Sequence, residues 1–237
     1  MPLDLFKYII YNWYRNNSII MGRYQTKTVS ATQPQQEGSP FMNQQSQYSP
    51  EDWPSIFTKS VIGIDRDGVI NEWKNVIKRR EDVQFISGSL EAIRKLRLIG
   101  HRVILFSDQP NIQRGLLTQQ DVQGVMQYMM QQFGQAGIFS IDGFYFNTSD
   151  MSQDPYAKPN IGMLNKAKNE VGVDFSKGYY VGDTIEDIKM AIKAKSTPVL
   201  VRTGRGADTE KKYLKAFDTK YKDVQVFDSL LDFANSL

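Results

Sequence analysis

Two carboxylates, Asp65 and Asp67, stand two residues apart where a short apolar run ends, in the stretch Val61-Ile-Gly-Ile-Asp65-Arg-Asp67-Gly-Val-Ile-Asn71. The apolar run predicts a buried β-strand, and Gly68 allows the chain to leave that strand sharply. Burying two charges is costly unless a partner compensates them. A hard divalent cation would be such a partner, and it would hold one carboxylate ready to attack phosphorus.

The same stretch is also compatible with a β-hairpin. In that interpretation Asp67 and Gly68 form a two-residue turn between Ile62–Ile64 and Val69–Trp73. The stretch alone leaves both interpretations open, so the rest of the chain has to decide between them.

Further polar residues lie at the ends of other predicted strands. Ser107-Asp108-Gln109 ends the second strand, Gly182-Asp183 ends the fourth with Asp187 four residues later, and Lys158-Pro159 precedes a helix. Each has a simpler explanation on its own: a turn, an exposed lysine, a solvated charge, or a helix cap formed by Asp183 with Glu186. Together they have the order expected for phosphoryl transfer through an aspartyl-phosphate.

Alternating strands and helices must position these residues. The predicted strands are Ser60–Asp65, Arg102–Ser107, Asp142–Phe146, Gly178–Val181, Pro198–Val201 and Val224–Phe227, and the predicted helices are Ser89–Leu98, Thr118 to about Gly137, Asn160–Val171, Thr184–Lys193 and Ser229–Asn235. This alternation predicts a three-layer, Rossmann-like α/β fold with a mostly parallel sheet. Ligands of such sheets bind beyond the carboxyl ends of the strands.

The composition excludes several kinds of chemistry. The chain has no cysteine and one histidine, His101, for which we expect a surface or turn position. Disulfides, thiolate zinc sites and cysteine nucleophiles are therefore excluded, and no serine motif supports a triad built on His101. The net charge of +3 is too small to argue for nucleic acid by itself.

The first 56 residues differ from the rest of the chain. Residues 1–21 are aromatic and compatible with an amphipathic helix that docks on the domain, on a partner or on a membrane surface, and their few positive charges favour docking on protein. Residues 22–56 are rich in Gln, Ser and Pro and predict a disordered linker, and residues 57–237 form the predicted domain. We find no apolar transmembrane stretch and no signal-peptide pattern, so we expect a cytoplasmic protein.

The motifs taken together resemble a known family. Asp65-Arg-Asp67-Gly-Val-Ile-Asn71, Ser107, Lys158-Pro159 and Val181-Gly-Asp183-Thr-Ile-Glu-Asp187 look like the four motifs of the haloacid dehalogenase-like (HAD) superfamily. Gly88–Leu96, the loop from Gln109 to Gly115 and Val199–Gly204 are similar to the subfamily of D-glycero-D-manno-heptose-1,7-bisphosphate phosphatases and histidinol-phosphate phosphatases. The resemblance covers about residues 58–235.

The resemblance implies a Mg²⁺-dependent phosphatase. Asp65 would be the nucleophile, and Asp67 would act as general acid and then as base, with its backbone carbonyl on Mg²⁺. Asp65 and Asp183 would supply carboxylate ligands to the ion, with Asp187 supporting them.

Four further residues receive roles from the resemblance. Ser107 and Lys158 would hold the transferring phosphoryl oxygens. Gln109 and Arg114, in the loop after the second strand, are candidates for substrate binding, and so is Arg202.

This sequence departs from its subfamily in two loops. The subfamily commonly has a Cys/His zinc loop after the third strand, whereas Asn147–Ala157 contains neither residue type, so no zinc is expected. In the second motif Asp108 replaces a neutral amide, which leaves the substrate's identity open. About forty residues separate Asp67 from Ser107, too few for a large cap domain.

The sequence therefore predicts a phosphatase for a small phosphorylated metabolite, such as a sugar phosphate like heptose bisphosphate. One alternative is a polynucleotide 3′-phosphatase, in which Lys211, Lys212, Lys215, Lys220 and Lys222 would contact the nucleic-acid backbone. A second alternative is a non-catalytic binding or scaffold protein that keeps the fold.

Overall fold

The structure is a computed structural model that describes residues 60–214 and 221–237. The predictions for residues 1–56, and those for Lys215 and Lys220, lie outside the described residues. The strands are β1 Val61–Asp65, β2 Arg102–Asp108, β3 Gly143–Asn147, β4 Tyr179–Gly182, β5 Thr197–Val201 and β6 Gln225–Phe227. The helices are α3 Ser89–Leu98, α4 Gln119–Gln135, α5 Gly162–Val171, α6 Ile185–Lys193, α7 Gly206–Thr209 and α8 Leu230–Asn235.

The six strands form one sheet in the order β3-β2-β1-β4-β5-β6. Every neighbouring pair is parallel, which confirms the predicted fold class. The chain builds β2 and β3 on one side of β1 and then crosses over to place β4, β5 and β6 on the other side. The strand order thus reverses between β1 and β4, and open parallel sheets bind their ligands at this point.

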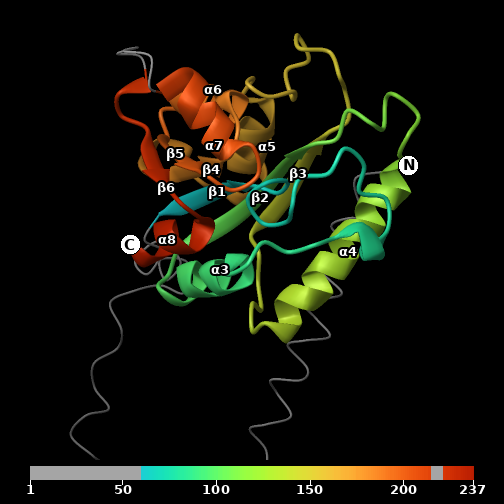
Figure 1. Cartoon of the computed structure of the whole chain (residues 1–237), viewed down its shortest axis with the longest axis horizontal. Helices are drawn as coiled ribbons and strands as arrows, with labels where there is room; N and C mark the ends of the chain where they lie inside the picture. Colours follow the sequence, from blue (N-terminus) through green and yellow to red (C-terminus); the bar gives the residue numbers. More distant parts are fainter. Residues whose placement is uncertain (1–59, 215–220) are drawn as a thin grey trace, which may run out of the picture. The chain divides into compact units, whose positions relative to one another are not determined.

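Helices cover both faces of the sheet. Helices α5 and α6 pack on one face, where Met163, Leu164 and Met190 join Phe106 and Tyr180 of the strands in one buried cluster. Helices α3, α4 and α8 lie on the opposite side in Figure 1. The side chains of a strand alternate between the two faces, so a sheet buried on both sides needs apolar residues at every position. The five-residue strand β1 is buried throughout, and it is free of polar side chains up to its last residue, Asp65.

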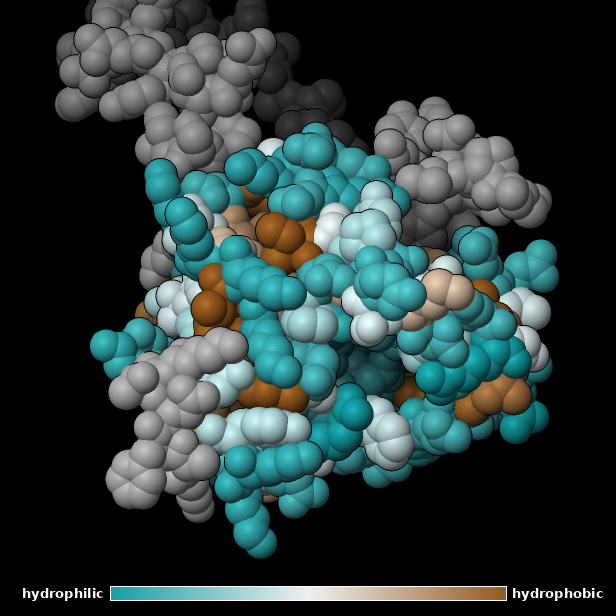
Figure 2. Space-filling view, turned by 90° about the horizontal axis from the view of Figure 1, so that it is seen from above, coloured by the Kyte–Doolittle hydropathy of each residue, from teal (hydrophilic) through white to brown (hydrophobic). Residues whose placement is uncertain are grey.

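The outer surface differs from these buried faces. Figure 2 shows that one face of the molecule is mostly hydrophilic, with hydrophobic residues in separate patches. Within the described ranges, no helix is both long and apolar enough to cross a membrane.

Most predicted elements are found, with boundary shifts of one or two residues. Helix α4 starts as expected, because the Thr118 hydroxyl accepts from the backbone N–H of Asp121 and the Asp121 carboxylate accepts from Thr118 in return. The expectation for His101 was wrong: this residue is buried, and its ring bonds to the Ser60 hydroxyl at 2.8 Å.

The hairpin interpretation of the first motif was also wrong. No strand follows β1 until β2, and the segment after Asp65 folds into tight turns in which Ile70 N–H donates to the Arg66 carbonyl. Gly68 has φ +89°, a conformation that favours glycine, and a Cβ there would lie 2.1 Å from Asp183 Oδ2. This turn brings the first motif directly against the fourth.

Candidate active site

The residues singled out in the sequence converge where the strand order reverses. Asp65 is the last residue of β1, and Asp183 directly follows β4, the parallel neighbour of β1. Asp187 lies in the first turn of α6, which starts from the same strand end. Carboxyl ends of parallel strands share one edge of the sheet, so residues more than a hundred positions apart become neighbours.

Three buried carboxylates form the centre of the site. Asp65, Asp183 and Asp187 each offer an oxygen, and these three oxygens all lie within 4.8 Å of one another. Asp187 is fixed by a capping box, because its Oδ2 accepts a 2.5 Å hydrogen bond from the Thr184 hydroxyl. Thr184 is therefore the N-cap of α6, and the alternative in which Asp183 and Glu186 cap this helix was wrong. Asp183 is left available for other chemistry.

Lys158 supplies the positive charge of the cluster. Its ammonium Nζ lies 2.5 Å from Asp65 Oδ1 and 2.8 Å from Asp187 Oδ1, and its side chain is 5% exposed. The exposed-lysine alternative was therefore wrong. Burial by itself lowers the pKa of Lys158, but the carboxylates of Asp187 and Asp65 outweigh burial and hold this pKa well above its usual value. Lys158 is thus a permanent cation next to the expected nucleophile.

The carboxylates have unusual proton affinities for a physical reason. Burial raises the pKa of Asp65 well above its usual value, and the repulsion of Asp187 and Asp183 adds to this effect although Lys158 opposes it. Burial and Asp187 likewise raise the pKa of Asp183 to about 7. A further positive charge in this arrangement would favour the ionised form of both groups.

The cluster has the chemistry of a Mg²⁺ site. Three carboxylates against one ammonium leave an excess of two negative charges, which a divalent cation would balance. Asp183 Oδ1 is buried and has no hydrogen-bond donor. Carboxylate oxygens are the ligands that Mg²⁺ prefers. A Cβ at Gly204 would lie 2.3 Å from Asp183 Oδ2, so this glycine keeps the surroundings of the carboxylate free of side-chain atoms.

Asp67 lies apart from the three-carboxylate cluster and is held by four neighbours. Its Oδ1 accepts from Arg66 Nη2 and Asn71, and its Oδ2 accepts from Arg66 Nε, Ser107 and Gln109, at distances of 2.9 to 3.1 Å. Burial raises the pKa of Asp67, but the charge and hydrogen bonds of Arg66, with those of Asn71 and Ser107, outweigh it and lower the pKa. Asp67 is therefore an ionised acceptor in this conformation.

The Ser107 hydroxyl, which was expected to hold a phosphoryl oxygen, bonds to Asp67 in this structure. Its side chain is fully buried, it donates to Asp67 Oδ2 at 2.9 Å, and it accepts from Gln109 at 2.7 Å. It is not among the residues that line the pocket. The geometry thus gives Ser107 and Gln109 a shared task, which is to hold Asp67.

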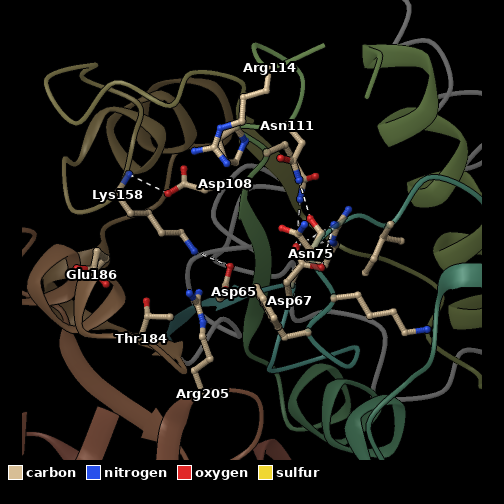
Figure 3. A pocket seen from close by; sticks show the side chains of 16 residues that line it. Asp65, Asp67, Asn75, Asp108, Asn111, Arg114, Lys158, Thr184, Glu186 and Arg205 are labelled. Atoms are coloured by element: carbon tan, nitrogen blue, oxygen red, sulfur yellow. Dashed lines mark hydrogen bonds and ion pairs between the residues drawn. The ribbon is translucent and has the colours of Figure 1, made fainter. Parts of the chain in front are cut away.

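A pocket of about 400 Å³ opens over these groups, and Figure 3 shows Lys158, Asp65 and Asp67 together in it. Gln109 and Arg114 line it as expected, although Arg114 also pairs with Asp150 at 3.1 Å. Arg202 does not line this pocket. Its guanidinium pairs with Glu210 and Asp228 at 2.7 and 2.6 Å, so the structure gives no support to the expectation that it binds substrate. Arg205, three residues later, lines the pocket instead.

Among the residues of the site to which sequence reasoning gave no role are Arg66, Asn71, Trp73 and Arg205. The first two were inside the quoted motif, and an arginine between two carboxylates is a signal for an ion pair. Arg205 immediately follows the quoted Val199–Gly204 stretch, at the carboxyl end of β5. Trp73 carried no signal, because only the turn after β1 brings it to the pocket.

Comparison with known proteins places this site in a family. A family model described as HAD-hydrolase-like matches residues 155–233. The D-glycero-beta-D-manno-heptose-1,7-bisphosphate 7-phosphatase of Yersinia pestis is 34% identical over 164 residues, which are 65% of this chain and 87% of that protein. The enzyme of the same name from Escherichia coli K12 is 30% identical over 161 residues, 64% of this chain and 81% of the relative.

Solved structures agree. The D,D-heptose 1,7-bisphosphate phosphatase from B. bronchiseptica, complexed with magnesium and phosphate, has a TM-score of 0.67 and 26% identity, covering 75% of this chain and 97% of that one. An apo phosphoserine phosphatase, at 13% identity and a TM-score of 0.50, shares the fold alone. The fold and the site define a phosphatase of the HAD-like type. The chain belongs to the family of the heptose-1,7-bisphosphate 7-phosphatases within that superfamily.

Proposed function

We propose that this protein is a Mg²⁺-dependent phosphomonoester hydrolase that acts through an aspartyl-phosphate on Asp65, with a small sugar phosphate such as heptose bisphosphate as substrate. One observation carries the proposal: Asp65, Asp183 and Asp187 share one buried site with the ammonium of Lys158. A binding or scaffold role does not require this costly arrangement of buried charges.

In the first step a carboxylate oxygen of Asp65 attacks phosphorus, and the bond from phosphorus to the leaving oxygen breaks. Lys158 lies 2.5 Å from Asp65 and neutralises charge on the phosphoryl oxygens as they pass the nucleophile. Asp65, Asp183 and the backbone carbonyl of Asp67, with Asp187 beside them, would hold Mg²⁺, which would supply the remaining positive charge.

Asp67 handles the proton in both halves of the reaction. In the first it donates a proton to the leaving oxygen, and in the second it takes a proton from the water that attacks phosphorus and releases Asp65. The present conformation fits the second half, because Asp67 is ionised and held by donors on both oxygens. The first half requires one of these donors to give way to the leaving oxygen.

The sugar-phosphate substrate rests on two observations. The relatives with 30% and 34% identity are named as heptose bisphosphate phosphatases. The pocket is lined by many polar groups, which suit the hydroxyls of a sugar, and its volume of about 400 Å³ is within the range of small-molecule sites.

The proposal is tested by measuring phosphate release from a panel of sugar phosphates, histidinol phosphate and a 3′-phosphorylated oligonucleotide, with Mg²⁺ or with EDTA. We expect release from sugar phosphates in Mg²⁺ alone. Asp65→Asn removes the nucleophile at nearly constant shape and should lower kcat by roughly 10³-fold or more. Asp174→Asn, in an exposed turn, is the matched control.

Three outcomes would contradict the proposal. Activity that persists in EDTA would exclude the metal, and activity that survives Asp65→Asn would exclude the nucleophile. Preference for the oligonucleotide, with steep salt dependence, would instead identify a polynucleotide 3′-phosphatase.

A further inference from the structure

Arg205 and Trp73 form a stacked pair in the wall of the pocket. The Arg205 guanidinium carbon lies 5.3 Å from the centre of the Trp73 ring, a cation–π geometry. The backbone N–H of Arg205 donates to Asp183 Oδ2 at 2.8 Å, so its main chain is fixed to the catalytic cluster. In Figure 3 its side chain points from the segment after β5 into the pocket. An arginine that is anchored at its backbone and held by a ring is pre-organised for a ligand.

Arg205 differs from the other cations of the pocket in its pairing. Arg66, Arg114 and Lys158 each lie within 3.1 Å of a carboxylate oxygen. The ammonium of Lys74 donates to the backbone carbonyl of Asp82. For Arg205, the recorded carboxylate contact is Asp183 Oδ2 at 3.9 Å from its Nε, which is beyond hydrogen-bond distance. Among the cationic groups of the pocket, the guanidinium of Arg205 thus has the weakest contacts with acceptors of the protein.

Exposure distinguishes two cations of the pocket. Lys158, beside the expected nucleophile, has a side chain that is 5% exposed, whereas the Arg205 side chain is 54% exposed. Trp73 is 45% exposed beside it. The buried cation therefore serves the phosphoryl group that reacts, and the exposed cation lies nearer the solvent, where the rest of a substrate would extend.

We propose that the Trp73–Arg205 pair binds a second anionic group of the substrate, a phosphate or a carboxylate at a distance from the phosphoryl group that is cleaved. This inference rests on the proposed function, since it assigns a specificity residue to the same site. A guanidinium presents two parallel N–H donors, which match a phosphate or carboxylate, and the ring limits its other orientations. Asp108 and Glu186 line the same pocket and repel an anion, which directs it towards Arg205.

The test compares sugar phosphates with and without a second anion. kcat/KM is measured for fructose 1,6-bisphosphate against fructose 6-phosphate, with 6-phosphogluconate as the arm that carries a carboxylate. Arg205→Gln should lower kcat/KM for the doubly anionic substrates by roughly ten- to a hundredfold and leave the monophosphate nearly unchanged. Trp73→Leu should give a smaller loss of the same kind. The doubly anionic substrate with the larger loss of kcat/KM shows whether the pair binds a phosphate or a carboxylate.

Controls separate charge from structure. Arg205→Lys should retain part of the preference, and Arg202→Gln, outside the pocket lining, should retain all of it. Thermal unfolding of every variant checks that it folds. Equal losses of kcat/KM for the mono- and bisphosphate would show that Arg205 binds the reacting phosphoryl group, and this would overturn the proposal. Unchanged kinetics with both substrates would also overturn it.

A binding experiment tests this inference separately from the proposed function. Fructose 1,6-bisphosphate is titrated calorimetrically into Asp65→Asn and into the double variant Asp65→Asn/Arg205→Gln. A roughly tenfold or greater loss of affinity in the double variant supports the second-anion site even if the wild-type protein releases no phosphate. Equal affinities for the two variants would overturn the inference even if the wild type proves to be an active phosphatase.

Discussion

The ammonium of Lys158 lies 2.5 Å from Asp65 Oδ1, although 93 positions separate the two residues in the sequence. Both side chains are almost fully buried. A second carboxylate, Asp187, lies 2.8 Å from the same ammonium. Asp183 is the third carboxylate of the cluster, and its ion pair with Arg205 Nε is longer, at 3.9 Å. A divalent cation would balance this excess of negative charge, and the first prediction follows from it.

Mg²⁺ should stabilise the folded protein through Asp183. A ligand present at a hundred times its Kd stabilises by about 2.7 kcal/mol, which is a rise in Tm of roughly 5–10 °C for a domain of this size. Asp183→Asn should remove most of that rise. The measurement is Tm by calorimetry with Mg²⁺ and with EDTA, and Asp174→Asn should behave like the wild type. A full Mg²⁺ response in Asp183→Asn would show that the ion binds elsewhere.

Ser107→Ala should lower kcat by about tenfold and leave KM unchanged. The hydroxyl donates to Asp67 and is fully buried, so its loss costs about one hydrogen bond in positioning the acid–base group. Steady-state kinetics on a sugar phosphate measures both parameters, with Ser152→Ala in an exposed loop as control. A higher KM at constant kcat would instead place the hydroxyl on the substrate, as the sequence had suggested.

Asp108→Asn should stabilise the protein at neutral pH. Burial raises the pKa of Asp108 above its usual value, although Lys158 and Asn147 oppose this effect. A carboxyl whose folded pKa is raised favours folding below its unfolded pKa of 3.8, and this contribution is lost as pH rises through the folded value. Removing the charge should therefore raise Tm at pH 7.

The comparison of wild type and Asp108→Asn is made by thermal unfolding from pH 3.5 to 8. The advantage of the variant should shrink steadily as the pH falls. An advantage that is independent of pH would point to a packing effect, and a lower Tm at pH 7 would contradict the prediction.

Asp142→Ala should weaken the fold without affecting catalysis. Asp142 precedes β3, at the end of the sheet away from the site, and its carboxylate accepts from Arg97, Arg102 and the backbone N–H of Val103. Its loss leaves two partly buried guanidinium groups without this partner, which we expect to cost about 2 kcal/mol. Urea unfolding measures the loss of stability, and an unchanged kcat/KM separates this residue from the site. A drop in kcat/KM at full stability would show that the two ends of the sheet are coupled.

The sequence by itself determined the layer order, the parallel sheet and the main site residues. Apolar runs of strand length alternate with amphipathic helices, and this alternation allows few topologies. Asp65, Lys158 and Asp183 could be identified because each lies at the end of a predicted strand or just before a helix. Their residue types at those positions have few purely structural explanations when they occur together.

Only the tertiary structure decided what each side chain touches. Spacing along the chain did not reveal that Ser107 faces Asp67, because this contact depends on side-chain directions across neighbouring strands. It also did not decide whether Asp183 or Thr184 caps α6, since both residue types are suitable N-caps. Arg202 and Arg205 both follow the carboxyl end of β5, and the local sequence pattern does not show which of them enters the pocket. The turn after β5 directs Arg202 to Glu210 and Arg205 to Trp73 in the pocket, since packing between distant segments fixes where each long side chain ends.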